Sequence, residues 1–554
     1  MITLTLYNGD TRQVAEGSTL LPLAQEFAKD FATPIVEGVF NGETIDLQQP
    51  LYTDGTVDFI QLKGEDGLRV YVRTLLFLFL MTSKRLYPEV DVEVHNTLGS
   101  SLHCVFKGEN KLSAKALKLI EAEMRKLVEQ KAPIKLLRIT KAEALGKYKY
   151  LCNDDLAPLM CNIADEDLVS VYSLNGEVGY LFGAMCPDAG YITEFKLMPF
   201  DDGIILDYPA FSDWKELVNF RDLTKLNAAF RETEEWAEMI KCDTIGKLNR
   251  YIEMGVADKI IQMAEALHEK KFAAIADEIA KHRDKIKLVL IAGPSSSGKT
   301  SSTQRISIQL AVNGIRPIPI SMDDYYVNRV DTPRKPNGDY DFETIDAIDL
   351  ELFNAHLTRL LRGEKVKIPK YNFQTGLREY RGTELQLTEN SVLLVEGIHG
   401  LNDKLTDSIP AENKIKIYVS ALIPLAFDQY NRINTTDVRL LRRMVRDSQF
   451  RSHDAVATLS RWADVREGEE KYIFPYQCSA DVIMNTNLIY EMAVIKKYAE
   501  PLLEAVPRET GKPYMIARRL LRLLKHVKSM NDDVIPNNSL LREFIGGSVF
   551  KEAL

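Results

Sequence analysis

A chain of 554 residues is too long for one hydrophobic core, and the usual domain size of about 150 residues predicts three or four folded units. Its 45% hydrophobic and 27% charged residues are typical of folded domains and argue against disorder. A formal net charge of −9 gives no electrostatic support for polyanion binding along the whole chain, although local basic patches stay open.

Membrane insertion and a disulfide framework are also disfavoured. The start, MITLTLYNGD, lacks the features of a signal peptide, and the apolar run LLFLFLM at 75–81 is too short to span a bilayer. The six cysteines include no CxxC pair, which favours reduced thiols over disulfides or a zinc ribbon. We therefore expect a cytoplasmic protein that has no membrane partner.

The first half of the chain predicts two mixed domains. Residues 1–63 contain short β-type runs around one helical segment, and Asn41-Gly42 between two such runs predicts a hairpin turn, so we expect a β-grasp-like unit. Residues 68–225 predict a mixed α and β domain, with a charged helix in SAKALKLIEAEMRKLVEQ and strands from VSVYSLNGEVGYLFG onward.

The second half predicts a helical connection and a larger domain. Apolar residues at helical spacing over 231–284 predict two linker helices. Strand-like and helix-like segments then alternate over 286–505, the pattern of a doubly wound parallel sheet. A tail over 506–554 follows, whose helix YMIARRLLRLLKHVKSM has a basic face.

The first 225 residues resemble the N-terminal part of threonyl-tRNA synthetases. The segment VEGVFNGETIDLQQPLYTDGTVDFI is similar to their TGS domain, and the next 160 residues are similar to their α+β editing domain. That domain carries the metal-site patterns HxxxH and CxxxH, but here Arg73 and Phe77 replace the two histidines and Gly190 replaces the last ligand. Only Cys186 remains, and one thiolate does not hold zinc, so we expect a degenerate domain without editing hydrolysis.

The segment GPSSSGKT fits the phosphate-binding pattern GxxxxGK[ST]. An apolar strand, KIKLVLIA, precedes it, and a helix that ends at Asn313-Gly314 follows it, which is the context that the motif requires. Backbone N–H groups in such a loop converge on phosphate oxygens, Lys299 neutralises the β and γ phosphates, and the Thr300 hydroxyl can bind Mg²⁺. We expect ATP to be bound by Gly293, Pro294, Ser295, Ser296, Ser297, Gly298, Lys299, Thr300 and Ser301.

Acidic residues end two further strands. The run RPIPISMDDYY reaches Asp323-Asp324, and we expect this strand end to lie beside the loop through a right-handed crossover. A carboxylate there can accept the proton of an attacking hydroxyl or orient Mg²⁺, although an acidic turn is the alternative. SVLLVEG ends in Glu396, which we favour as a magnesium ligand over a simple strand end.

Four arginines in TTDVRLLRRMVRDSQFR share one face of a helix. Arg439, Arg442, Arg443 and Arg446 fall at i, i+3, i+4 and i+7, and Arg451 follows just beyond. A solvated face is the ordinary interpretation of such a pattern. Beside a phosphate-binding loop, we favour a lid helix that stabilises the charge of a transferring phosphoryl group.

Residues 286–505 resemble the uridine kinase and phosphoribulokinase family of P-loop kinases. The matching pieces, in the family's order, are GPSSSGKT, MDDYY, DFETIDAID, IPKYNF, VLLVEGI, RRMVRD and SADVIM. The resemblance implies ATP-dependent, Mg²⁺-assisted phosphorylation of a nucleoside or sugar hydroxyl. It places the catalytic base at Asp323, nucleoside contacts at Tyr326, Glu343 and Tyr371, and lid arginines at Arg443, Arg446 and Arg451.

Three positions depart from the family where its pyrimidine kinases read the base. Gly376, His453 and Arg461 stand where the family typically has His, Arg and Gln. Losing such contacts is expected to broaden or redirect the choice of nucleoside, because a site that hydrogen-bonds a polar group discriminates strongly against ligands without it.

The sequence therefore predicts a multidomain α/β protein whose function is that of a nucleoside kinase with a synthetase-like N-terminus. Two alternatives stay open: a kinase of a non-nucleoside sugar or sugar phosphate, and a regulatory ATP-binding protein that senses RNA or a small ligand. Contact of the N-terminal half with RNA and homo-oligomerisation are also left open.

Overall fold

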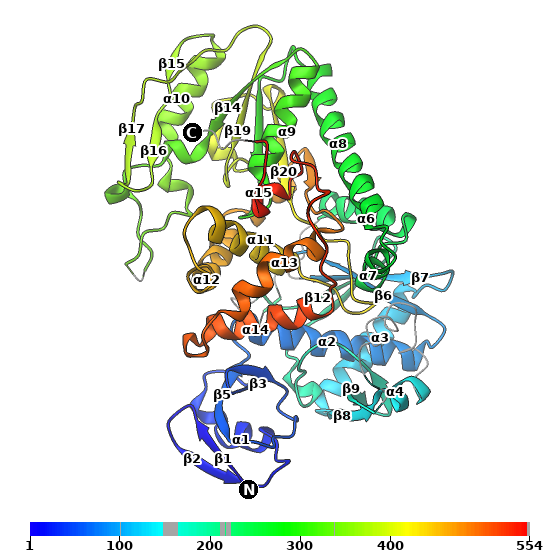
Figure 1. Ribbon diagram of the computed structural model, residues 1–554. Coiled ribbons are helices and arrows are strands. Elements are labelled where there is room, and N and C mark those ends of the chain that lie inside the picture. Colours follow the sequence, from blue (N-terminus) through cyan, green and yellow to red (C-terminus); the bar gives the residue numbers. More distant parts are fainter. Residues whose placement is uncertain are drawn as a thin grey trace.

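The computed structural model describes residues 1–99, 101–147, 164, 166–210, 216–217, 223–336 and 338–550. Figure 1 shows an N-terminal β-sheet domain in blue, a second domain in cyan and a larger C-terminal domain from green to red. The red end of the chain returns to the C-terminal domain and lies against its helices. The predicted multidomain α/β fold is confirmed.

The N-terminal domain is a five-stranded sheet with strand order β2-β1-β5-β3-β4 and one short helix against it. The turn between β3 and β4 is the predicted hairpin, with φ of 56° at Asn41 and 82° at Gly42, values that suit Asn-Gly. Leu20 and Leu23 of the helix segment pack on Leu4 and Phe59 of the sheet, which closes the core of a β-grasp-like domain. Its elements are β1 (Ile2–Leu6), β2 (Thr11–Val14), α1 (Leu21–Glu26), β3 (Ile35–Phe40), β4 (Glu43–Ile45) and β5 (Gly55–Gln61).

The second domain combines two antiparallel sheets, β11-β12-β7-β6 and β10-β9-β8, with helices. The apolar run at 75–81 lies inside α2, where it is buried, and the predicted charged helix is α3, whose first turn is capped by the Ser113 hydroxyl. Its elements are α2 (Glu65–Leu86), β6 (Asp91–Thr97), β7 (Ser101–Lys107), α3 (Ala114–Glu129), β8 (Ile134–Thr140), α4 (Lys141–Lys147), β9 (Leu168–Leu174), β10 (Glu177–Gly179), β11 (Lys196–Phe200) and β12 (Gly203–Asp207). Among the described residues, no helix is both long enough and apolar enough to cross a membrane.

Three helices connect the two halves, so the prediction of two linker helices is wrong. They are α6 (Thr224–Met239), α7 (Ile245–Glu253) and α8 (Ala257–Lys281). The Thr244 hydroxyl accepts a hydrogen bond from the Lys247 N–H and starts α7, and Gly255 with φ of 67° separates α7 from α8. These local signals divide a stretch whose apolar spacing is continuous.

The C-terminal domain is built on five parallel strands in the order β14-β19-β13-β20-β21. Successive side chains of β13 point to opposite faces, so Leu288 and Leu290 pack under α10 whereas Val289 and Ile291 pack under α8 and α9. Helices on both faces confirm the doubly wound sheet. The elements are β13 (Leu288–Ala292), α9 (Lys299–Val312), β14 (Arg316–Ser321), α10 (Leu350–Leu361), β19 (Ser391–Glu396), β20 (Lys414–Ser420) and β21 (Val482–Asn485).

Short strands and a group of helices complete this domain. The segment after α10 contains the two-stranded pairs β15–β18 and β16–β17. The last helices share one hydrophobic core with α7 and the first part of α8. The bounds are β15 (Val366–Lys367), β16 (Lys370–Asn372), β17 (Leu377–Glu379), β18 (Glu384–Leu385), α11 (Thr435–Phe450), α12 (Ala455–Tyr472), α13 (Glu491–Glu504), α14 (Lys512–Lys525) and α15 (Arg542–Ile545).

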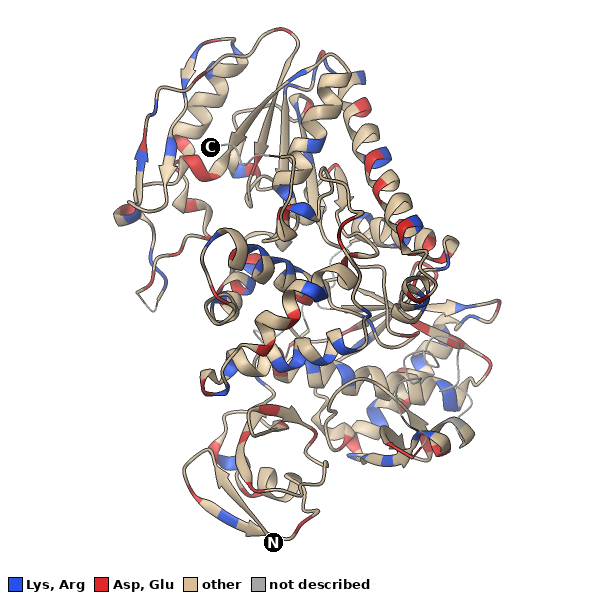
Figure 2. Cartoon of the chain, viewed as in Figure 1, with Lys and Arg blue, Asp and Glu red and all other residues tan. Residues whose placement is uncertain are grey.

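The basic face predicted for the tail helix lies on α14, where Lys and Arg gather close to those of α2 (Figure 2). Arg518 donates to the Glu43 carboxylate at 2.8 Å, and Arg522 donates to the Thr44 hydroxyl at 2.8 Å. This face of α14 therefore contacts the N-terminal β-sheet domain.

Candidate active site

The loop between β13 and α9 has the shape that its glycines require. A Cβ at position 293 would lie 2.0 Å from the Val419 carbonyl oxygen, and Gly298 has φ of 85°, so glycine fits both positions best. Ser296 also has a positive φ, 57°, which turns the backbone within the loop. The Lys299 ammonium donates to the Gly293 carbonyl at 2.8 Å, and this hydrogen bond joins the end of the loop to its beginning. The result is a P-loop at the N-terminus of a helix, which is suited to phosphate.

Glu396 lies beside this loop because β19 pairs directly with β13. The Thr300 hydroxyl donates to one oxygen of Glu396 at 3.4 Å, and the Thr303 hydroxyl donates to the other at 3.2 Å. Burial raises the pKa of Glu396 to about 7, and the nearby Lys299 opposes this shift. The two predicted magnesium ligands, Thr300 and Glu396, thus come together.

Asp323 reaches the same place by a different route from the predicted one. We expected its strand to lie next to the loop, but β14 pairs with β19, which separates it from β13. The turn Met322–Tyr325 after β14 brings Asp323 back toward Lys299, whose charge lowers the Asp323 pKa against a larger rise from desolvation. The carboxylate remains exposed to water although protein surrounds much of it.

The neighbouring carboxylate is engaged elsewhere. Asp324 accepts from the Tyr371 N–H at 3.4 Å and lies 3.6 Å from the Lys370 ammonium. Within the described part of the chain, no hydrogen bond occupies the side chain of Asp323. Of the two aspartates, Asp323 is therefore the one placed to receive a proton.

The three predicted lid arginines surround one buried carboxylate at the loop. Arg443 donates to the Ser295 hydroxyl at 2.7 Å and lies 3.4 Å from Asp447. Arg446 donates to Asp447 at 2.7 Å, and Arg451 lies 3.7 Å from it with half of its side chain exposed. Three cations share one anion, which leaves positive charge beside the P-loop.

Arg439 and Arg442 are not lid cations, and this part of the lid prediction is wrong. Both are fully buried. Arg439 pairs with Glu469 and donates to the Ser295 carbonyl at 3.0 Å, and Arg442 pairs with Glu491. They contact the P-loop backbone from the protein interior. Only the outer part of the arginine-bearing face of α11 reaches the solvent.

Sequence reasoning missed three residues that contact the loop. Glu469 accepts from the Ser295 N–H at 3.1 Å, Thr486 donates to the Ser297 carbonyl, and Glu543 of α15 accepts from the Ser301 N–H at 3.2 Å. They lie 174, 189 and 242 residues along the chain from their partners, so no local pattern marks them.

An aromatic cluster lies directly after Asp323. The ring of Tyr326 is 5.5 Å from that of Tyr371 and 6.4 Å from that of Phe373, measured between centroids. Tyr326 donates to the Phe342 carbonyl, whereas the buried Tyr371 hydroxyl has no hydrogen-bond partner among the described residues. Phe373 is 61% exposed, so the cluster presents an open aromatic surface.

A family model that includes kinases matches most of the C-terminal α/β domain. Residues 288–489 match the Phosphoribulokinase / Uridine kinase family model. Among solved structures, a "Possible Uridine Kinase" from Bacillus stearothermophilus is 24% identical, with 26% of this chain and 78% of that chain covered and a TM-score of 0.21. The D-glycerate 3-kinase of Cryptococcus neoformans is 15% identical, with 52% and 91% covered and a TM-score of 0.20. We call the range 286–505, which contains this match, the kinase domain.

The N-terminal half matches threonine–tRNA ligases. The enzyme of Desulforamulus reducens is 26% identical over 198 residues, which is 36% of this chain and 31% of the ligase. That of Enterococcus faecalis is 28% identical over 200 residues, 36% of this chain and 30% of the ligase. The chain thus spans about a third of the length of the curated relatives that it matches.

The remaining predicted positions of the kinase domain lie in different surroundings. Glu343 packs against Gly468 of α12, and burial raises its pKa to about 7. Gly376 has φ of 72°, and the Arg329 side chain fills the space that a side chain there would take. His453 and Arg461 are exposed, before and on α12.

The degenerate metal pattern lies inside the second domain. Arg73 on α2 donates to the Ala184 carbonyl at 2.6 Å, and Phe77 on the next turn is fully buried. Cys186 is buried, which raises its pKa to about 12, and Gly190 lies against Lys131. Among the described residues, no group of three or more His, Cys, Asp or Glu is able to hold a metal ion.

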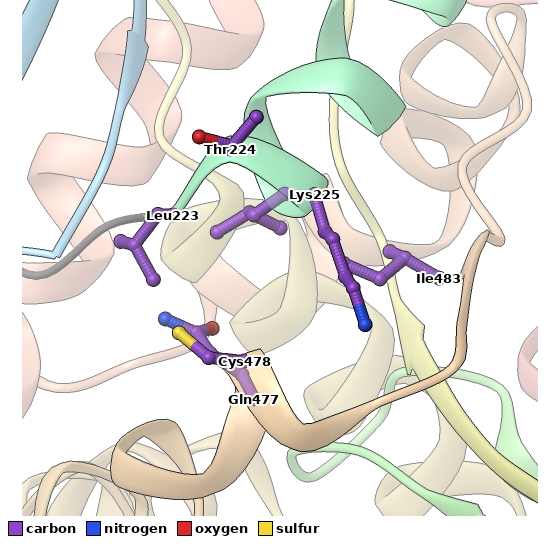
Figure 3. Close-up of a pocket in the computed structure, with 7 residues that line it drawn as sticks. Leu223, Thr224, Lys225, Gln477, Cys478 and Ile483 are labelled. Carbon is purple, nitrogen blue, oxygen red and sulfur yellow. The ribbon is translucent and has the colours of Figure 1, made fainter.

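A small pocket of about 200 Å³ lies at the start of α6 (Figure 3). It is lined by the start of α6, at Leu223 to Leu226, and by Gln477 and Cys478 near the end of the kinase domain. Lys225 crosses it and donates to the Ala480 carbonyl at 2.7 Å. The pocket joins the connecting helices to the kinase domain and contains none of the predicted site residues.

Proposed function

We propose that the protein is an ATP-dependent nucleoside kinase that transfers the γ-phosphoryl group to a ribose 5′-hydroxyl. Asp323 is the general base, Lys299 and the lid arginines stabilise charge on the phosphates, and the P-loop binds ATP. The N-terminal half is a non-catalytic part of the enzyme.

The observation that carries the nucleoside assignment is the aromatic cluster that begins at Tyr326, three residues after the general base Asp323. Tyr326, Tyr371 and Phe373 form an apolar surface with an exposed ring, which suits a planar base. The unpartnered Tyr371 hydroxyl offers a hydrogen bond to a polar ligand. A sugar without a base would leave this surface uncovered.

The transfer balances with the groups at the site. The acceptor hydroxyl gives its proton to Asp323 as its oxygen attacks the γ-phosphorus, and the bond from that phosphorus to the β–γ bridging oxygen breaks, releasing ADP. Lys299 and Arg443 offset the charge spread over the phosphoryl oxygens. Arg451, half exposed, can close over the group once the acceptor is bound.

The acidic groups at the P-loop fit a magnesium ion. The Glu396 carboxylate faces the Thr300 hydroxyl; burial raises its pKa, and the negative charges of Asp323 and Glu543 add to this rise. When bound, Mg²⁺ supplies charge neutralisation between the phosphates. Thr300 and Glu396 are the residues that would hold it, directly or through water.

We also propose an altered preference for the base. Gly376 offers no side chain, and the Arg329 guanidinium lies in its place and donates to the Phe373 carbonyl. A guanidinium is a donor only, so it suits an acceptor on the base. Because acceptor atoms occur on pyrimidine and purine bases alike, such a donor gives uridine only a weak preference and allows the use of purine nucleosides.

A competition assay tests both levels of the proposal. Uridine, cytidine, inosine, guanosine and adenosine are supplied at equal concentration with ATP and Mg²⁺, and the monophosphates are measured by mass spectrometry. Exclusive conversion of uridine and cytidine would refute the altered preference. No monophosphate from any nucleoside, with ADP formed from a sugar or sugar phosphate, would favour a sugar kinase.

A further inference from the structure

A large cavity lies between the N-terminal half and the kinase domain. Its volume is about 820 Å³, within the range of small-molecule sites, which is about 300–1,000 Å³. The walls come from α2 and β6 on one side, from the start of α11 and from α12 on another, and from α14 on a third. All described domains of the chain contribute to it.

The cavity is positively charged although the chain is not. Its lining contains eight Lys and Arg against five Asp and Glu, a formal charge of +3 with histidines neutral, and the buried Glu234 and Glu469, which are not part of the lining, pair with Arg432 and Arg439 and reduce this excess to +1. The whole chain carries −9. An excess of positive charge in a concave site attracts an anionic ligand.

Two of these cations, Arg73 and Lys525, form no ion pair with a described residue, whereas Arg69 pairs with Glu65 at 2.8 Å and shares Asp437 with Arg519, at 3.5 and 2.6 Å. Arg73 donates instead to a backbone carbonyl. Guanidinium groups donate hydrogen bonds with a geometry that suits the oxygens of a phosphate group.

Aromatic rings form another part of the lining. Phe182 and Phe427 are 5.1 Å apart, and the His526 ring lies 5.3 Å from Phe182 at an angle of 37°. All three line the cavity. Rings at such spacing offer a surface on which a planar heterocycle stacks.

We propose that this cavity, which reaches Pro294 of the P-loop, is a second nucleotide site next to the ATP site and binds a phosphorylated nucleoside through its arginines and its aromatic wall. Helix α11 links the two sites. Asp437 and Arg439 of α11 line the cavity, Arg439 donates to the Ser295 carbonyl, and Arg443, one turn further on, donates to the Ser295 hydroxyl. Occupation of the cavity therefore changes the affinity of the P-loop for ATP.

Equilibrium dialysis of the full chain tests the site. Radiolabelled AMP, ADP, ATP, UMP and GMP are the probes, and at least one of them binds with a stoichiometry of two per chain. Lys299→Ala removes the P-loop class and leaves one. Arg73→Gln, which keeps a hydrogen-bond donor but removes the charge, and Lys525→Glu, which reverses an exposed charge, each weaken the other class at least tenfold.

The control is Lys512→Glu on the same helix α14, outside the cavity, which leaves both classes unchanged. A variant that fails to fold loses both classes, so selective loss of one class separates a local effect from unfolding. A stoichiometry of one for every probe, abolished by Lys299→Ala, overturns the proposal. Displacement of the second nucleotide by inorganic pyrophosphate at equal concentration contradicts the role of the aromatic wall. A monophosphate can also occupy the nucleoside site proposed beside Asp323, so only the binding class that Arg73→Gln and Lys525→Glu weaken is assigned to the cavity.

Discussion

Asp437 of α11 pairs with Arg69 of α2 in the N-terminal half and with Arg519 of α14, and replacing these two arginines tests how much the contact stabilises the fold. Its side chain is 3% exposed and accepts from Arg519 at 2.6 Å and from Arg69 at 3.5 Å. Arg69→Met with Arg519→Met keeps the aliphatic bulk and leaves the carboxylate buried without a cation. An uncompensated buried charge costs about 3–5 kcal/mol, so the free energy of unfolding at pH 7 falls by that amount.

The pH dependence gives the sign of the effect. The two guanidinium groups hold the pKa of Asp437 well below its usual range. In the parent chain this stabilisation is full above the ordinary Asp pKa of about 3.9 and is lost only as pH falls through the lower folded-state value. In the double variant burial raises the pKa instead, so its stability deficit shrinks as pH falls from 7 toward 4.

Urea denaturation at pH 7 and pH 4.5 measures both quantities. The control is Arg518→Met, which removes a more exposed pair with Glu43 and costs about 0.2–1 kcal/mol. Adding Asp437→Leu to the double variant removes the unpaired charge and recovers most of the lost stability. A double variant as stable as the parent chain, or no recovery with Asp437→Leu, would refute the reasoning.

Three further predictions concern the P-loop. Asp323→Asn lowers the rate of phosphoryl transfer by about 10²- to 10⁴-fold and leaves ATP binding nearly intact; ADP release and ATP titration measure the two. An active Asp323→Asn together with an inactive Asp324→Asn would instead assign the general base to Asp324. Because burial raises the pKa of Glu396 to about 7, protons compete with Mg²⁺, so the Mg²⁺ concentration for half-maximal rate increases below pH 7; Glu396→Gln weakens Mg²⁺ activation and removes this dependence, and a pH-independent requirement in the parent chain contradicts it. Glu543→Gln tightens ATP binding several-fold, since its carboxylate takes the Ser301 N–H and repels phosphate; unchanged or weaker binding by calorimetry counts against this contact.

The local sequence pattern was sufficient to predict the elements around the P-loop. The apolar strand, the glycine loop and the helix that ends at Asn313-Gly314 are adjacent in sequence, so the P-loop followed from a single segment. The Asn41-Gly42 turn followed in the same way, because the left-handed backbone of such a turn selects these residues.

Long-range partners were beyond such reasoning. Four arginines at i, i+3, i+4 and i+7 define one helix face, but the spacing does not tell which of them find buried partners. Glu469 and Glu491, which lie 30 and 49 residues away, take Arg439 and Arg442 into the core, whereas Arg443 and Arg446 stay at the loop. The order of the parallel strands has the same origin, since the position of β19 between β13 and β14 depends on pairing between distant segments.

Transfer to the 5′-hydroxyl is the central claim, and one comparison tests it most directly. ADP release is measured with the nucleoside that the competition assay finds best and with its 5′-deoxy analogue, which keeps the base and the other ribose hydroxyls. The account predicts turnover with the nucleoside and only background release with the analogue, because the group that gives its proton to Asp323 is missing. Equal ADP release from both compounds would contradict it.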